Sequence, residues 1–214
     1  MKVFYFRQLI RLNKNESIMG LSIHFSGRLR NAEDLPSLLE EVRDVSEVYG
    51  WKYVIFNYNF PNDSFNSNDS FEKIYGINFT PTNCETVSLA FLSNGRMICP
   101  ARIPFFAHSK DETERSYIYY ISVKTQFAGV FNHQLLIRLL KHLNSKYLTD
   151  FNLSDESCYW ETDDENLMKG RFKLYDNLMD NFVLSVETFP MKEGEDMIVY
   201  FERLMKHIQD LKNR

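Results

Sequence analysis

Residues 21–30 alternate strictly between apolar and polar side chains, and this alternation constrains the fold more than any other feature of the sequence. The apolar positions are Leu21, Ile23, Phe25, Gly27 and Leu29. Successive side chains of a strand point to opposite faces, so the pattern predicts a strand with one buried face and one polar face. Such strands are typical of antiparallel sheets, which can expose one face to water.

The next two segments predict a helix and a second strand. Apolar residues recur at helical spacing over residues 35–49, and Gly50 can end that helix. Residues 51–58 are a nearly continuous run of aromatic and β-branched residues. Such a run favours a strand covered on both faces, so we place it inside the sheet.

A hairpin is predicted in the middle of the chain. Residues 74–80 and 86–92 have the composition of strands, and Asn94-Gly95 precedes a third short strand at 96–99. Residues 100–116 contain two prolines and a charged run, so we expect a long exposed connection there. Residues 117–127 return to period two and predict another strand.

Helical patterns dominate the rest of the chain. Residues 131–148 predict a helix, followed by an acidic loop at 149–159 and two further helices, at about 163–189 and 195–211. The expected buried stripe of the first of these helices is Phe131, Leu135, Leu139, Leu143 and Tyr147. Thr162 and Glu165 have the spacing of a capping box, which explains the acidic residues 161–165 better than a metal site does.

This order of elements predicts a single α+β domain over residues 19–214. We expect a mainly antiparallel sheet of five or six strands, with the helices at 35–49 and 131–148 packed on one face and a helical C-terminal part at 150–214. Residues 1–18 are expected to be an N-terminal extension, for which disorder and inclusion in the domain are both open alternatives.

Charge and hydropathy argue against two classes of partner, and the cysteine content indicates the compartment. With 25 Lys and Arg against 29 Asp and Glu, the net charge is −4, which does not provide the broad positive field that nucleic-acid binding needs. No run approaches the roughly 18–20 apolar residues of a membrane-spanning helix. The three cysteines, Cys84, Cys99 and Cys158, are odd in number and fit a reducing compartment. We therefore expect a cytoplasmic protein that binds neither nucleic acid nor membrane.

The strongest candidate for a binding surface is the polar side of the predicted sheet. If the strands at 21–30 and 117–127 share a core, their polar residues lie together on the opposite face. The predicted ligand-binding residues are His24, Arg28, Ser122, Lys124 and Gln126. Three potential cations among small side chains could hold an anion, whereas an ordinary solvated sheet face is the simpler alternative.

The sequence favours neither a metal centre nor a nucleophilic enzyme. His133 and His142 are expected on the surface of one helix and on different faces of it, and no histidine pair has the spacing of a zinc helix. We expect no metal and no cofactor. Cys84 could act as a nucleophile only in an electropositive setting, so a buried or incidental thiol is the default interpretation.

These patterns favour a non-enzymatic binding or regulatory module that uses the polar sheet face or a protein interface. Its partner would be another protein or a small anionic ligand. The alternative is a small hydrolase or transferase acting on an anionic substrate, with His24 as general base. A homo-oligomer formed through the apolar stripe of the last helix is a third hypothesis.

Overall fold

The computed structural model describes residues 20–67 and 70–212 of the chain. Its internal contacts divide the chain into two compact units, Met1–Lys169 and Gly170–Arg214. Every described strand lies in the first unit, and the described part of the second is helical. The predicted N-terminal extension, residues 1–18, lies outside the described residues.

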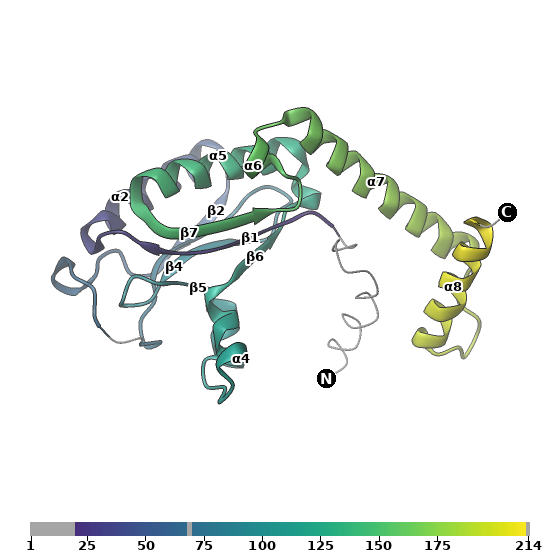
Figure 1. The fold of residues 1–214 in the computed structure, drawn as a ribbon, viewed down its shortest axis with the longest axis horizontal. Coiled ribbons are helices and arrows are strands. Elements are labelled where there is room, and N and C mark those ends of the chain that lie inside the picture. Colours follow the sequence, from purple (N-terminus) through teal and green to yellow (C-terminus); the bar gives the residue numbers. More distant parts are fainter. Residues whose placement is uncertain (1–19, 68–69, 213–214) are drawn as a thin grey trace. The chain divides into compact units, whose positions relative to one another are not determined.

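The first unit contains two antiparallel sheets (Figure 1). Their strands are β1 (Ser22–Leu29), β2 (Lys52–Ile55), β3 (Tyr75–Thr80), β4 (Val87–Phe91), β5 (Met97–Ile98), β6 (Ile121–Lys124) and β7 (Leu148–Asp155). One sheet has the order β6-β1-β7 and the other the order β2-β3-β4-β5. The α+β class and the antiparallel pairing are confirmed, but the strands form two sheets of three and four rather than one of five or six.

The two sheets meet at the end of β1. Arg28 forms an isolated antiparallel bridge with Arg96, and the backbone N–H of Leu29 donates to the carbonyl of Gly95 over 2.8 Å. Gly95 belongs to the predicted turn between β4 and β5 and has a φ of 80°, which favours glycine. The β4–β5 hairpin is therefore confirmed, and it also supports the neighbouring sheet.

Helices cover the sheets separately. The α-helices are α2 (Leu35–Val48), α3 (Ile103–Phe106), α4 (Glu112–Ser116), α5 (Gly129–Tyr147), α6 (Tyr159–Thr162), α7 (Glu165–Thr188) and α8 (Met197–Lys212). Single 3-10 turns are Ala32–Asp34, Pro61–Asp63, Pro100–Arg102, Tyr117–Tyr119 and Gln126–Ala128. Helix α2 packs on β2 and β3, whereas α5 packs on β7, so the two helices do not share one sheet as predicted.

A carboxylate connects these two helices. Glu41 of α2 accepts hydrogen bonds from Nε2 of His142 and the hydroxyl of Tyr147, each over 2.7 Å, and it also pairs with Lys146. Burial by itself raises the pKa of Glu41, but these three partners outweigh it and lower the pKa. The pairing fixes α2 against α5 above the two sheets.

Three predicted segments differ from the structure. Strand β2 lies at the edge of its sheet with Val54 63% exposed, so residues 51–58 are not covered on both faces. Residues 100–116 form a 3-10 turn, α3 and α4 instead of an irregular connection. Here Ile103 packs with Tyr119 on a small second core beneath β4 and β5. The predicted strand at 117–127 is shortened to β6 because residues 117–119 form a 3-10 turn.

Strand β7 corrects the prediction of an acidic loop at 149–159. It pairs along almost all of β1, with Phe25 opposite Leu153 and Leu29 opposite Leu148. Phe151 and Leu153 alternate with polar residues in the sequence, which is the period of a strand. The C-terminal part of the chain therefore begins with a strand and is not helical throughout.

Helix α5 buries part of the predicted stripe: Leu139, Leu143 and Tyr147 are buried as expected, but the N-terminal end of the stripe is not. Phe131 is 64% exposed, whereas His133 is fully buried. The buried side chains of α5 are His133, Leu136, Ile137, Leu139, Leu140, Leu143 and Tyr147. The expectation of a surface His133 was wrong because this histidine has polar partners inside the fold.

The N-cap of α7 is also displaced from its predicted position. Asp164 accepts hydrogen bonds from the backbone N–H groups of Asn166 (2.8 Å) and Leu167 (3.0 Å), so Asp164 caps the helix. Thr162 ends α6 instead, and its hydroxyl accepts from the N–H of Asp164 over 3.1 Å. Capping explains this acidic segment, as expected, but with a different residue.

The second unit folds α8 back along the end of α7. Glu195 accepts two hydrogen bonds from Arg203, over 2.7 and 2.8 Å, and this pairing lowers the pKa of Glu195 to about 2. The rings of Phe189 and His207 stack with centroids 4.4 Å apart. Tyr200 and Leu204 are buried, whereas Leu184 and many other apolar side chains are exposed. In the described parts of both units, no helix is both long enough and apolar enough to cross a membrane.

Candidate functional site

The β6-β1-β7 sheet has one face made of polar residues. Strand pairing places Ser22 opposite Lys124, and places His24 opposite both Ser122 and Ser154. Residues directly opposite each other in a sheet share a face. We call this surface the polar face; it consists of Ser22, His24, Ser26, Ser122, Lys124, Asn152, Ser154 and, immediately after β7, Glu156.

His24 lies near the middle of the polar face. Its ring stacks on that of Tyr120 with centroids 5.5 Å apart, and its Nε2 is 3.9 Å from Oε1 of Glu156. The other carboxylate oxygen of Glu156 accepts from the N–H of Ser22 over 2.7 Å, which fixes the carboxylate beside the imidazole. The Nδ1 atom of His24 is buried and has no hydrogen-bond partner among the described residues.

Lys124 and Gln126 approach each other at Gly20. A Cβ at Gly20 would lie 2.2 Å from Oε1 of Gln126 and 3.2 Å from Nζ of Lys124, and the φ of +114° also favours glycine. Within the described part of the chain, Oε1 of Gln126 is buried without a partner. Lys124 has no carboxylate at ion-pair distance among the same residues, and its ammonium lies 5.1 Å from the ring centre of Phe127.

Arg28 does not belong to the polar face. The register of β1 with β7 shifts between Ser26 and Arg28, and Nη1 of Arg28 donates to the carbonyl of Asn94 over 2.7 Å. The structure therefore places His24, Ser122 and Lys124 together, with Gln126 beside them after β6. It directs Arg28 to the β4–β5 turn instead.

Sequence reasoning missed a second polar cluster on the opposite face of the same sheet. His133 of α5 lies between Thr125 and Ser157, with Nδ1 and Nε2 each 2.8 Å from a hydroxyl oxygen. Nε2 is also 3.3 Å from Oδ1 of Asp155. All four side chains are buried, and we call them the buried network.

Asp155 makes the most contacts in the buried network. Its carboxylate accepts from the N–H and the hydroxyl of Ser157, and from the N–H groups of Tyr159 (2.9 Å) and Trp160 (3.0 Å) at the start of α6. Burial raises the pKa of Asp155, but the hydrogen bond and charge of His133, together with Ser157, outweigh burial and lower it. The network is saturated with hydrogen bonds and enclosed, as expected of a structural element.

Cys84 has none of the features of a nucleophile. Burial, followed by the charge of Glu85, raises the pKa of its thiol to about 12. Its sulfur lies 3.6 Å from the carbonyl of Lys124, so the thiol is a weak donor at the edge of the sheet. In residues 20–67 and 70–212, no three His, Cys, Asp or Glu side chains are grouped as metal ligands.

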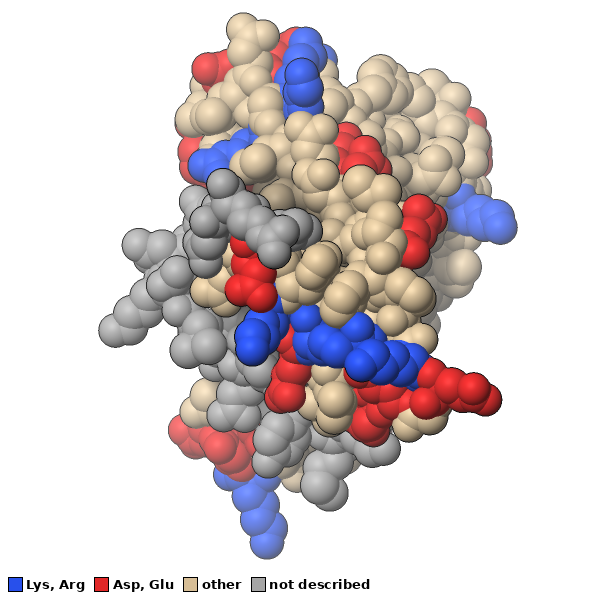
Figure 2. All heavy atoms as spheres, turned by 90° about the vertical axis from the view of Figure 1, so that its right-hand side faces the viewer, with Lys and Arg blue, Asp and Glu red and all other residues tan. Residues whose placement is uncertain are grey.

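Charges of both signs are mixed over the surface in Figure 2. The Lys and Arg groups on this side are bordered by Asp and Glu, and wide uncharged areas separate the groups. Among the described residues in this view, the positive side chains therefore form small groups next to acidic ones.

Fold and site together define an α+β protein with a polar, incompletely hydrogen-bonded sheet face. Comparison of the chain with protein-family models, with curated proteins and with solved structures found no match. The function must therefore be inferred from the residues themselves.

Proposed function

We propose that this chain is a non-enzymatic binding module whose polar face holds a small organic anion that also carries a hydrogen-bond donor. One observation supports this most strongly: two buried polar atoms without partners, Nδ1 of His24 and Oε1 of Gln126, adjoin the same face. Buried polar atoms are nearly always hydrogen-bonded in folded proteins. A bound ligand that supplies both partners accounts for the pair.

The side chains around these atoms define the ligand class. The Lys124 ammonium can only donate and carries a positive charge that no described carboxylate neutralises, so it favours an anionic group. Oε1 of Gln126 and the carboxylate oxygens of Glu156 are acceptors, so they favour a donor such as an amine or hydroxyl. Hydroxy acids and amino acids combine the two requirements.

An enzymatic role is the alternative, and the position of Glu156 favours it. A carboxylate 3.9 Å from Nε2 of a histidine can orient the ring and stabilise its protonated form, as a general base requires. Replacement of Glu156 by Gln separates the roles, because turnover would fall far more than affinity.

Native mass spectrometry of the full chain, purified gently from its source cells, tests the proposal. The wild-type chain is expected to carry the added mass of one small hydroxy acid or amino acid, which Lys124→Met and His24→Leu each remove. Lys141→Met is the control, because Lys141 pairs with Asp163 away from this face and its loss should leave the adduct in place. A bare wild-type chain, or an adduct that survives Lys124→Met, would contradict the proposal.

A further inference from the structure

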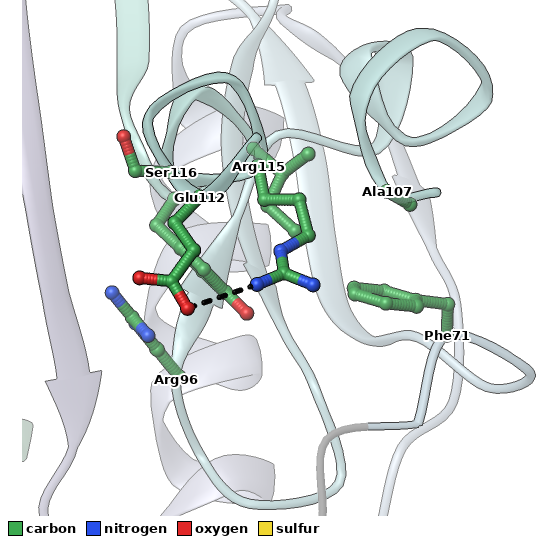
Figure 3. Close-up of a pocket in the computed structure, with 8 residues that line it drawn as sticks. Phe71, Arg96, Ala107, Glu112, Arg115 and Ser116 are labelled. Atoms are coloured by element: carbon green, nitrogen blue, oxygen red, sulfur yellow. Dashed lines mark hydrogen bonds and ion pairs between the residues drawn. The ribbon is translucent and has the colours of Figure 1, made fainter. Parts of the chain in front are cut away.

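A pocket of about 420 Å³ lies beneath the β4–β5 hairpin, away from the polar face. Its walls come from the hairpin, the segment before β3, and the region of α3, α4 and the following 3-10 turn (Figure 3). Small-molecule sites usually have volumes of about 300–1,000 Å³. The pocket is therefore large enough for a ligand of a few rings or fewer.

Arg96 supplies a half-buried positive charge to this pocket. Its Cζ lies 3.3 Å from the ring centre of Tyr119, so the guanidinium is stacked on the aromatic face. Among the described residues, its side-chain N–H groups have neither a hydrogen-bond acceptor nor a carboxylate partner. A stacked guanidinium keeps its N–H edges open, and these edges match the two oxygens of a carboxylate.

Arg115 provides a second guanidinium, which forms a weak ion pair with Glu112. Nη2 of Arg115 lies 3.4 Å from Oε1 of Glu112, and the Glu112 side chain is 90% exposed. Exposed ion pairs of this kind contribute little to stability. Figure 3 shows Glu112 and Arg115 directed toward each other and Arg96 reaching toward the same space. The Glu112 carboxylate therefore occupies a position that an incoming anion could take.

Apart from Ser116, the remaining walls are apolar or aromatic. Phe71, Ala107 and Ile118 line the pocket, and Phe71 also packs on the small core under β4 and β5. Two guanidinium groups at one side of the pocket suit a ligand with one anionic end, and their planar N–H edges match the two oxygens of a carboxylate. Aromatic walls favour a flat apolar body on the ligand.

We propose that this pocket binds an aromatic monocarboxylate, whose carboxylate pairs with Arg96 and Arg115 and displaces Glu112. The site is separate from the polar face and does not depend on the function proposed for it. Glu112 acts as an internal competitor, so its removal should increase affinity.

An NMR titration of the full-length ¹⁵N-labelled chain with benzoate tests this proposal. We expect saturable shifts in residues 93–97 and 112–119, with weaker binding of acetate and none of the neutral isostere benzamide. Glu112→Gln should bind benzoate about threefold more tightly, since it removes an exposed competing pair. Arg96→Met should weaken binding about tenfold or more, since a charge-assisted contact is lost. Lys110→Gln, an exposed cation next to α4 that does not line the pocket, is the matched control.

Three results would overturn the proposal: equal shifts with benzamide, unchanged affinity in Arg96→Met, or unchanged affinity in Glu112→Gln. The Glu112→Gln result decides the matter if Arg96→Met fails to fold, because Glu112 is exposed and its replacement should leave the fold intact. Lys124→Met separates the two sites. If that variant abolishes benzoate binding, the anion occupies the polar face and the pocket proposal is wrong.

Discussion

The two faces of the β6-β1-β7 sheet carry polar clusters that differ in how completely they are hydrogen-bonded. On the α5 side, each side-chain nitrogen and oxygen of His133 and Asp155 has at least one partner inside the protein. On the other side, Nδ1 of His24 and Oε1 of Gln126 are buried without described partners. The same three strands thus carry a fully hydrogen-bonded polar cluster on one face and an incompletely hydrogen-bonded one on the other.

The two polar clusters should therefore contribute differently to folding stability and to ligand binding. A saturated buried network stabilises the fold and gains nothing from a ligand, because no donor or acceptor remains to be satisfied. An unsatisfied cluster costs stability until something binds to it. Substitutions on the two faces should consequently have opposite effects on folding.

The largest expected effect is that of Asp155→Asn. The amide removes the charge beside His133 and places a donor among the N–H groups of Ser157, Tyr159 and Trp160, so we expect a loss of about 3 kcal/mol in the free energy of unfolding. Urea denaturation followed by tryptophan fluorescence measures the change.

The adjacent residue provides the control for this comparison. Glu156 lies on the polar face, and Glu156→Gln retains an oxygen that can accept from Ser22, so its effect should stay below about 0.5 kcal/mol. Equal losses in the two variants would show that the faces do not differ in the way described.

The loss of wild-type stability at acidic pH should be smaller than the loss caused by Asp155→Asn. Because the folded protein lowers the pKa of Asp155, its contribution is complete above the ordinary value of about 3.9 and is lost as the pH falls through the lower folded value. Wild-type protein should therefore lose stability more steeply below about pH 4 than Asp155→Asn does. Denaturation at a series of acidic pH values tests this, and parallel curves for the two proteins would contradict it.

A substitution on the polar face should change stability in the opposite direction. Gln126→Met removes the unpartnered Oε1 and keeps a side chain of similar length, so we expect about 1 kcal/mol of added stability. The same variant should bind the ligand of the polar face less tightly. A stability gain without a loss of the ligand adduct would show that Gln126 has no part in binding.

Local periodicity predicted the elements whose neighbours are close in sequence. The alternation of residues 21–30, the spacing within α2 and the Asn94-Gly95 turn each contain the information that fixes the local structure. From β1 and β6, the sequence also placed His24, Ser122 and Lys124 on one face. Whether these residues bind a ligand remains a proposal.

The elements that were missed depend on distant partners. Asp150, Asn152 and Ser154 made β7 resemble a loop, and the strand forms because it can pair with β1, more than 100 residues earlier. His133 is buried because Thr125 and Asp155, on two other elements, satisfy its ring nitrogens. The burial of His133 leaves no periodic signal in the sequence, whereas the strand alternation of Phe151 and Leu153 was present but was obscured by the turn-forming residues around them.

The central position of β1 has a consequence for the order of folding. The four-stranded sheet uses residues 52–98 and can pair as soon as they are available, whereas β1 must wait for partners at residues 121–124 and 148–155. Contacts between such distant segments form slowly, because a long loop must close first. During synthesis, β1 therefore spends the longest time unpaired of the seven described strands, with Ile23, Phe25 and Leu29 exposed to aggregation or to chaperones.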